Sequence, residues 1–208
     1  MPAFVVRVLP KVLKEFSREF SGIAVHIREE NEAQVTRCVE NGEADFGFSS
    51  DFVSSPELAY KPLVHDPIGL LCRADHPLAR RRSALTWKDL EGLPFVAFGP
   101  NTTVRRLIGT VEGLPKTVSE PAYEVADVIT MEALLEADLG VTAGFKLGAY
   151  RGRDRKLMFR PLVEPALGRT ISLITHAERA LSLAASALVD KTIMHLRRRT
   201  DGFRIDQK

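Results

Sequence analysis

The stretch Lys61-Pro-Leu-Val-His-Asp-Pro-Ile-Gly-Leu-Leu-Cys-Arg-Ala-Asp-His-Pro-Leu-Ala79 contains short apolar runs on either side of Asp66-Pro67. The runs at residues 58–64 and 68–72 have the length and composition of buried strands. Helical and strand patterns alternate along the rest of the chain, as they do in an α/β protein with parallel strands. The sequence therefore predicts an α/β fold.

Before this stretch, an apolar stripe opposite charged side chains predicts an amphipathic helix at residues 8–20. Alternating residues 23–27 predict a strand. A second helix is expected at 32–40, where Asn41-Gly42 ends it, and a buried strand is expected at 44–48, followed by a polar loop from Ser49 to Ser55. After it, the capping-box spacing Thr86-Trp-Lys-Asp89 opens a short helix, and the remaining predictions are strands at 94–98, 122–125, 157–160 and 170–175 and helices at 104–111, 128–137 and 180–198.

The composition is that of an ordinary globular protein. The 208 residues are 45% hydrophobic and 27% charged, and the formal net charge of +2 lacks the basic excess of a DNA-contacting domain. No apolar run is long enough to span a bilayer, and no signal peptide precedes the first helix. The two cysteines, Cys38 and Cys72, are interpreted as buried free thiols of a reducing compartment. These features predict a cytoplasmic protein without a membrane partner.

No catalytic motif is present in the sequence. The five histidines are scattered singly, and no Cys or His spacing is typical of a zinc site. The segment Gly47-Phe-Ser49-Ser-Asp51 resembles a nucleophile elbow but lacks its last glycine. Phosphate-binding glycine loops are also missing. We therefore predict no catalytic residue, no metal and no cofactor.

Three loops carry small polar residues where strands feed helices, which is where α/β sheets bind ligands. They contain Ser49-Ser50, Asn101-Thr102-Thr103, and Asp127 with Thr130. The free N–H groups at a helix N-terminus favour a carboxylate or phosphate, and Arg105 is placed to add a charge-assisted bond. Plain helix capping is the alternative for each loop taken alone, because Ser, Thr, Asn and Asp are preferred N-caps.

The chain resembles the effector-binding domain of LysR-type transcriptional regulators. The resemblance begins in residues 61–79, where a strand is followed by His-Pro-Leu-Ala. Further fragments match in the expected order across nearly all of the chain: Asn41-Gly-Glu-Ala-Asp-Phe-Gly-Phe48, Leu85-Thr-Trp-Lys-Asp-Leu-Glu-Gly-Leu-Pro-Phe95, Ala137-Asp-Leu-Gly-Val141 and Leu181-Ser-Leu-Ala-Ala185. Each fragment is short, so the assignment depends on the order and spacing of the fragments.

The resemblance implies a two-lobed fold like that of type 2 periplasmic binding proteins. Lobe one would comprise residues 1–66 and 169–208, and lobe two residues 67–168, with crossovers near residues 66–67 and 165–168. A small organic anion, with a carboxylate favoured, would bind in the cleft. The ligand-binding residues implied in this way, together with Arg105, are Pro2, Ala3, Ser49, Ser50, Asn101, Thr102, Thr103 and Thr130. DNA would be bound only through a helix-turn-helix domain absent from this chain, and the domains would pair as a homodimer or homotetramer.

Two departures from the family pattern are visible. Lobe one of the family begins with a central strand, whereas this chain begins near the loop that follows it. Residues 4–8 have strand propensity, but the resemblance favours a helix from Pro2 with Pro10 inside it. A lost central strand would leave its neighbours with unpaired backbone groups, so we expect a gap, a borrowed strand or poor stability. Gly144-Phe145 replaces the family's Leu-Pro, so ligand size and shape cannot be transferred.

The sequence therefore predicts a ligand-sensing domain of a transcriptional regulator. Closure around a ligand would reorient a DNA-binding domain, because the ligand has different affinities for the open and closed forms. A solute-binding protein for uptake is the first alternative, and the missing signal peptide and the cysteine pattern disfavour it. An enzyme on the same two-lobed fold is the second alternative. The identity of the ligand and the regulated genes cannot be predicted from the sequence.

Overall fold

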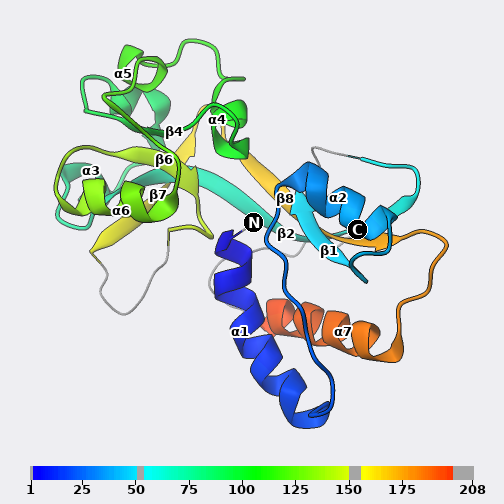
Figure 1. The fold of residues 1–208 in the computed structure, drawn as a ribbon. Helices are drawn as coiled ribbons and strands as arrows, with labels where there is room; N and C mark the ends of the chain where they lie inside the picture. The colour runs from blue at the N-terminus through cyan, green and yellow to red at the C-terminus, as the bar shows by residue number, and fades with distance from the viewer. Residues whose placement is uncertain (1, 51–53, 150–155, 199–208) are drawn as a thin grey trace. The chain divides into compact units, whose positions relative to one another are not determined.

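The chain forms two compact units, each of which contains helices and strands (Figure 1). Unit 1 consists of residues 1–66 and 169–208, and unit 2 of residues 67–168. The computed structural model describes residues 2–50, 54–149 and 156–198, without the side chains of Pro2 and Ala3. The chain passes between the units at Asp66-Pro67 and at Gly168-Arg169.

The first helix of unit 1, α1 (Pro2–Glu19), confirms the helix expected from Pro2, with Pro10 inside it. Proline suits the first helical position because its fixed φ angle matches the helix and its missing N–H has no intrahelical partner there. Apolar residues four apart form its buried stripe, namely Phe4, Val8, Val12 and Phe16. This stripe makes α1 a packing helix whose polar face remains in solvent.

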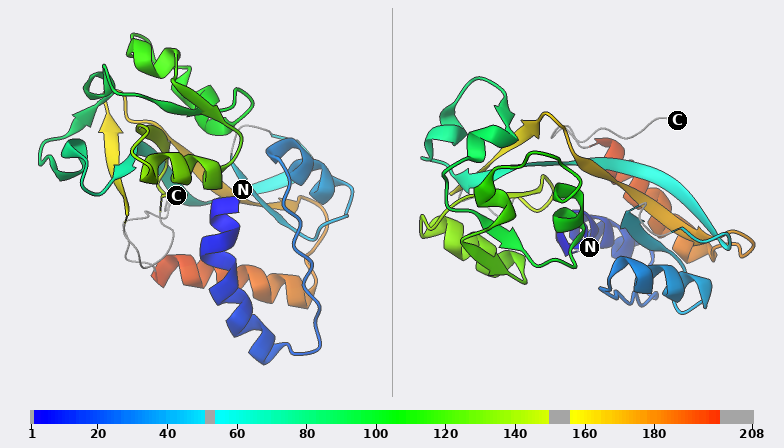
Figure 2. Two further views of the ribbon diagram at one scale, coloured as in Figure 1. Left: turned by 60° about the vertical axis from the view of Figure 1, so that its left-hand side comes forward. Right: turned by 90° about the horizontal axis from the view of Figure 1, so that it is seen from above.

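The last helix, α7 (Leu183–Arg198), packs beside α1, as Figures 1 and 2 both show. Its buried residues again recur at helical spacing and include Leu188, Thr192 and Leu196. Thr192 donates its hydroxyl hydrogen bond to the carbonyl of Leu188 over 2.8 Å, so this buried polar group has a partner. The α1–α7 pair thus supplies much of the apolar core of unit 1.

Helix α2 (Glu32–Glu40) has the bounds predicted from the sequence. The Asn31 side chain caps it by accepting a hydrogen bond from the amide of Gln34 over 3.0 Å. Gly42, with φ of 71°, turns the chain after it. At that angle a side chain would be strained, which explains why glycine ends the helix.

The sheet of unit 1 differs from the prediction in direction. Strand β1 (Gly47–Ser50) pairs antiparallel with β8 (Gly168–His176), and β8 lies next to β2 (Leu58–Arg73) in the strand order. The expectation of parallel strands was wrong for β1, because its partner is the segment that returns from unit 2 and runs against it. The two runs around Asp66-Pro67 form one continuous strand rather than two.

Two local predictions in unit 1 were also wrong. Residues 23–27 form no strand, although their side chains alternate as predicted, and no described segment pairs with them. Ser49 and Ser50 lie inside β1 rather than in a loop, because the strand begins and ends a few residues later than predicted. The remaining predicted loop includes residues 51–53, which lie outside the described chain.

In unit 2, the part of β2 after Pro67 pairs antiparallel with both β6 (Thr142–Phe145) and β7 (Leu157–Val163). β7 also pairs with the short parallel strand β3 (Leu85–Thr86). Strands β4 (Val96–Phe98) and β5 (Tyr123–Val125) pair parallel to each other. A hydrogen bond of 2.8 Å from the amide of Val96 to the carbonyl of Val141 links β4 to the segment entering β6.

The helices of unit 2 are short. They are α3 (Pro77–Arg80), the 3-10 helix η1 (Trp87–Leu90), α4 (Thr103–Ile108), α5 (Lys116–Ser119) and α6 (Val128–Glu136). Local side chains cap α3, α4 and α6. The predicted capping box is present, since the amide of Thr86 donates to Asp89 Oδ2 over 2.7 Å. Leu70, Leu85, Leu90 and Phe95 belong to the main buried cluster of unit 2. Within the described chain, no helix combines the length and apolar character needed to cross a membrane.

Candidate ligand-binding site

The predicted site residues of unit 1 lie at the end of β1. Ser49 and Ser50 are 2% and 1% exposed. Ser50 donates its hydroxyl hydrogen bond to the carboxylate of Glu32, the first residue of α2. Ser49 stands opposite Ser172 of β8 in the strand register, and Ser172 is also buried. The end of β1 is therefore a buried polar cluster that joins a strand to a helix N-terminus.

A buried ion pair lies at the boundary of the same unit. Arg169 Nη2 and Nε lie 3.1 and 3.3 Å from Asp66 Oδ2, and the two side chains are 9% and 0% exposed. Burial lowers the pKa of the Arg169 guanidinium, and the opposite charges of Asp66 and Glu32 counter that shift. Asp66 and Arg169 thus fix β2 and β8 together where both strands leave unit 1.

Sequence reasoning missed Glu32, Asp66 and Arg169. Asp66 and Arg169 are separated by 103 residues in the chain, so no local pattern joins them. Each type is normally found on the surface, and Arg and Asp are rarely buried unless they are paired. The only available signal was the position of Asp66 between two apolar runs.

In unit 2, the fold brings two of the predicted loops together. β4 and β5 are parallel neighbours, so their carboxyl ends lie at the same edge of their sheet. The loop after β4 contains Asn101 and Thr102, and the segment after β5 leads through Asp127 into α6. The amide of Gly99 donates to the carbonyl of Val125 over 3.0 Å, and this hydrogen bond joins the end of β4 to the end of β5.

The polar groups of the first loop cap α4. Thr102 Oγ1 accepts a hydrogen bond from the amide of Arg105 over 3.3 Å and donates to the carbonyl of Gly99 over 2.9 Å. Arg105 Nη1 donates to the carbonyl of Val118 over 3.1 Å. One guanidinium nitrogen is therefore engaged within unit 2. Asn101 is exposed, and Thr103 is half-buried at the first position of the helix.

Thr130 belongs to the cap of α6. Its amide and its hydroxyl each donate to the Asp127 carboxylate over 2.9 Å. The hydrogen bond from the Thr130 amide, and then the one from its hydroxyl, lower the pKa of Asp127 below the usual 3.8. The structure thus shows capping at this position, which was the alternative to ligand binding. The side chains of Pro2 and Ala3, also predicted as site residues, lie outside the described part of the chain.

This cap predicts a pH dependence. Because the pKa of Asp127 is lower in the folded chain, the stabilisation is present above the usual carboxyl pKa and is lost as pH falls through the folded value. Thr130→Val removes the hydroxyl donor but keeps the amide. The melting temperature of the wild type should exceed that of Thr130→Val at about pH 6, and the difference should shrink toward zero below about pH 3. A difference that stays constant over this range would contradict the assignment.

The described residues hold no cluster of three or more His, Cys, Asp and Glu side chains suited to a metal ion. Cys72 is buried as predicted, and its burial raises the pKa of the thiol to about 11, so it is not a nucleophile. Cys38 is half-buried rather than fully buried.

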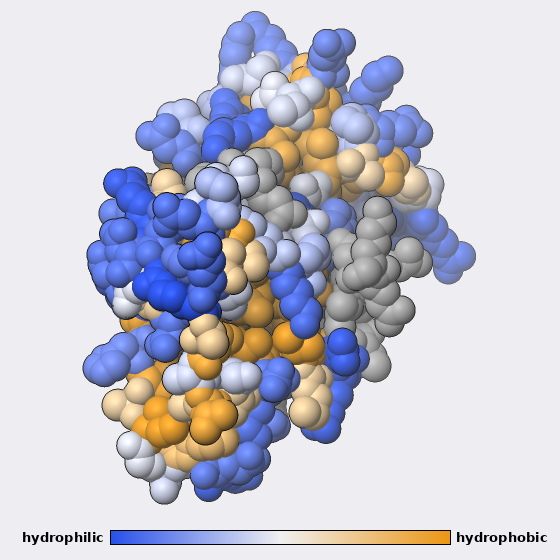
Figure 3. Space-filling model, turned by 90° about the vertical axis from the view of Figure 1, so that its right-hand side faces the viewer, coloured by the Kyte–Doolittle hydropathy of each residue, from blue (hydrophilic) through white to orange (hydrophobic). Residues whose placement is uncertain are grey.

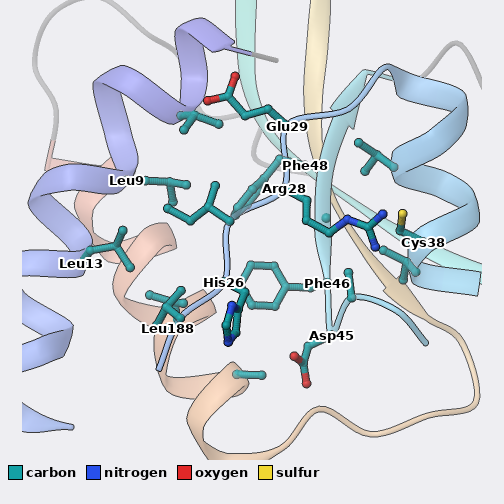
Figure 4. Close-up of a pocket in the computed structure, with 18 of the residues that line it drawn as sticks. Leu9, Leu13, His26, Arg28, Glu29, Cys38, Asp45, Phe46, Phe48 and Leu188 are labelled. Carbon is teal, nitrogen blue, oxygen red and sulfur yellow. The ribbon is translucent and has the colours of Figure 1, made fainter. Parts of the chain in front are cut away.

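A further cavity lies elsewhere in the described chain. It measures about 470 Å³, belongs to unit 1 alone, and is lined by α1, α7 and residues 23–30 together with α2 and the approach to β1 (Figure 4). None of the predicted ligand-binding residues whose side chains the structure describes lines it. This cavity is separate from the polar clusters above.

Residues 1–196 match the family described as the LysR substrate binding domain. An uncharacterized HTH-type transcriptional regulator, YbhD, of Escherichia coli (strain K12) is 30% identical over 89% of this chain and 58% of its own length. The chain thus spans less than two thirds of this curated relative. The regulatory domain of Synechocystis PCC6803 CcmR, solved in complex with 2-PG, has a TM-score of 0.78 at 19% identity and covers 93% of both chains.

The BenM effector binding domain, solved with its effector benzoate, has a TM-score of 0.73 at 18% identity, covering 92% of this chain and 86% of that one. Likenesses at this level of identity establish the fold, which is the two-lobed, periplasmic-binding-protein-like fold of effector-binding domains. With the match over residues 1–196, the chain belongs to the LysR substrate-binding domain family, whose members form part of transcriptional regulators. The predicted family and fold class are therefore confirmed.

Proposed function

We propose that this chain senses a small organic carboxylate and thereby controls the activity of a LysR-type transcriptional regulator. In this proposal units 1 and 2 are the two lobes of the domain. The ligand contacts Ser49 and Ser50 in unit 1 and the loop of Asn101 to Thr103 in unit 2. The proposal also assigns DNA binding to a helix-turn-helix outside residues 1–208, a homodimeric or homotetrameric assembly, and a cytoplasmic location.

The observation that carries the proposal is the edge formed by β4 and β5. Two polar loops meet there, and both lead into capped helix starts. Backbone N–H groups at such positions have no intrahelical partner and bind carboxylates. The Thr102 hydroxyl and the guanidinium of Arg105 belong to the same loop and helix. Benzoate, a carboxylate, is the effector of the related BenM domain, which supports this ligand class.

The polar cluster of unit 1 supports a second part of the proposal. Asp66 and Glu32 carry negative charge near the single guanidinium of Arg169. We therefore assign the carboxylate to the unit 2 loop and a neutral hydroxyl or amino group of the ligand to Ser49 and Ser50. Such a ligand controls the regulator only through a difference in affinity between two states of the domain.

A thermal-shift screen of small carboxylates tests the proposal. A ligand at about 100 times its dissociation constant adds about 2.7 kcal/mol to the stability of the folded state. Thr102→Ala should remove most of this gain, and Thr102→Ser should retain it, because serine keeps the hydroxyl. Thr110→Ala is the matched control, since the Thr110 hydroxyl donates to the Leu107 carbonyl beyond the other end of α4. Equal gains in Thr102→Ala and Thr110→Ala would place the ligand elsewhere.

An enzyme is the second candidate function, and no observation favours it. The pKa of Cys72 is shifted away from reactivity. The nucleophile-elbow-like Ser49 is buried within β1, opposite Ser172.

A further inference from the structure

The segment from Arg80 to Ser83 carries a local excess of positive charge. Hydrophilic side chains, blue in Figure 3, are spread over much of the face shown there, and the 29 basic residues of the chain are nearly balanced by 27 acidic ones. At the end of α3, however, three arginines follow one another and a serine comes directly after them. All four residues are exposed. The segment therefore places a serine hydroxyl beside a run of cations on the surface of unit 2.

The backbone of this segment is held by Arg160 of β7. Arg160 Nη2 donates to the carbonyl of Ser83 over 3.0 Å, and Nη1 donates to the carbonyl of Ala79 over 3.2 Å and to that of Arg81. Arg81 has an extended backbone, with φ of −63° and ψ of 130°, so the helix ends before the serine. The segment is thus an exposed, extended stretch whose carbonyl groups are bound to unit 2.

The Ser83 hydroxyl lies against the guanidinium of Arg81. Arg81 Nε donates to Ser83 Oγ over 2.6 Å, and Nη1 of the same side chain pairs with Asp89 Oδ1. Asp89 also accepts hydrogen bonds from the amide and the hydroxyl of Thr86, over 2.7 and 3.1 Å, in the capping box of η1. Arg81 therefore connects the serine hydroxyl to a carboxylate that has other hydrogen-bond partners.

A phosphoryl group on Ser83 would suit this arrangement better than the free hydroxyl does. It brings about two negative charges and three acceptor oxygens, and a guanidinium binds such a group through two parallel N–H bonds. Arg81 Nε already donates to the oxygen that would carry the phosphorus. Asp89 keeps its hydrogen bonds from Thr86 if Arg81 leaves it. Arg81 can therefore exchange the carboxylate for a phosphate while the capping box stays formed.

The residues before Ser83 also suit recognition by a kinase. Kinases select their substrates by the pattern of charged residues, and a kinase with an acidic substrate groove favours cations before the acceptor serine. Arg80, Arg81 and Arg82 occupy the three positions directly before Ser83. The same arginines thus serve to attract the kinase and to bind the product.

We infer that Ser83 is a phosphorylation site and that Arg81 binds the phosphate. A separate serine kinase transfers the terminal phosphoryl group of a nucleoside triphosphate to Ser83 Oγ. The bond between that phosphorus and its bridging oxygen breaks, the bond from Oγ to phosphorus forms, the nucleoside diphosphate leaves, and the hydroxyl proton passes to a base of the kinase. Arg81 then turns from Asp89 to the phosphate. This site is separate from the proposed carboxylate site at Asn101 to Thr103.

The first test uses the full 208-residue chain, ATP and a serine kinase that selects arginines before its acceptor. One phosphate per chain is expected, located on Ser83 by mass spectrometry and absent in Ser83→Ala. Ser21 is the internal control, because it is also exposed and has an arginine, Arg18, three residues before it but no run of arginines. Ser83 should react at least about tenfold faster than Ser21. Equal rates, or a chain without phosphate on Ser83, would overturn the inference.

The second test measures whether Arg81 binds the phosphate, by phosphorus NMR titration of the modified chain. The second pKa of a phosphoserine is ordinarily about 6, and a bound guanidinium lowers it because it favours the dianion. The pKa should therefore lie below that value in the wild type and return to it in Arg81→Gln. Arg106→Gln, which changes an exposed arginine of α4, should leave the pKa low. The same pKa in the wild type and Arg81→Gln would contradict the role of Arg81. Both tests are made without a carboxylate ligand, so their outcome is independent of the proposed function.

Discussion

Asp66→Asn should lower the free energy of unfolding by about 3–5 kcal/mol, the usual effect of breaking a buried ion pair by removing one partner. Asp66 is 0% exposed, and its partner Arg169 is 9% exposed, so the variant removes the carboxylate charge that lies 3.1 Å from a buried guanidinium. Chemical denaturation followed by circular dichroism measures the loss.

Two controls distinguish the effect of breaking a buried ion pair from the effect of removing any single carboxylate. Asp75→Asn removes a carboxylate from the ion pair with Arg73, which lies in solvent, and should change stability little. The double variant Asp66→Asn with Arg169→Met should recover part of the loss, because it removes the buried guanidinium as well. A loss in Asp66→Asn no larger than that in Asp75→Asn would show that the Asp66–Arg169 pair does not stabilise unit 1.

Trp87→Ala should lower the free energy of unfolding by about 3–5 kcal/mol, because it empties a large space in the core of unit 2. Trp87 is 3% exposed and packs in the main buried cluster of that unit. Its indole Nε1 donates to the carbonyl of Pro165 over 3.0 Å. Denaturation followed by circular dichroism is the appropriate measurement, since the variant removes the single tryptophan of the chain.

Trp87→Phe is the matched variant. It keeps an aromatic ring in the cluster but removes the donor to Pro165. The missing hydrogen bond should lower the free energy of unfolding by about 1 kcal/mol relative to the wild type. Equal losses in Trp87→Ala and Trp87→Phe would mean that the hydrogen bond, rather than the packing of the ring, carries the contribution of this residue.

The longer helices of the fold were predicted from the sequence, whereas the short helices α3 and α5 were not. α2 has the expected bounds because Asn31 caps its first turn and Gly42 turns the chain just after its last residue. Residues 23–27 were predicted wrongly for a physical reason. Alternation shows that a segment is suited to a strand, but a strand also needs a neighbour to pair with. In the described chain a cavity, not a strand, lies beside these residues.

The sequence predicted only those parts of the candidate site that are formed by residues close together in the chain. The loop at Asn101 to Thr103 and the Asp127–Thr130 cap follow from residue type and position before a helix. The Asp66–Arg169 pair and the contact from Ser50 to Glu32 join distant parts of the chain, so only the folded structure brings them together. The direction of the Arg105 guanidinium toward Val118 also depends on tertiary contacts that sequence spacing does not encode.

The most direct test of the proposed function compares small carboxylates with their neutral amides, beginning with benzoate and benzamide, in calorimetric titrations of the chain. We predict that at least one carboxylate of the screen binds, that its amide binds at least about tenfold more weakly, which corresponds to about 1.4 kcal/mol, and that Thr102→Ala weakens the carboxylate alone. Equal affinity for a carboxylate and its amide, or carboxylate binding that Thr102→Ala leaves unchanged, would contradict the account.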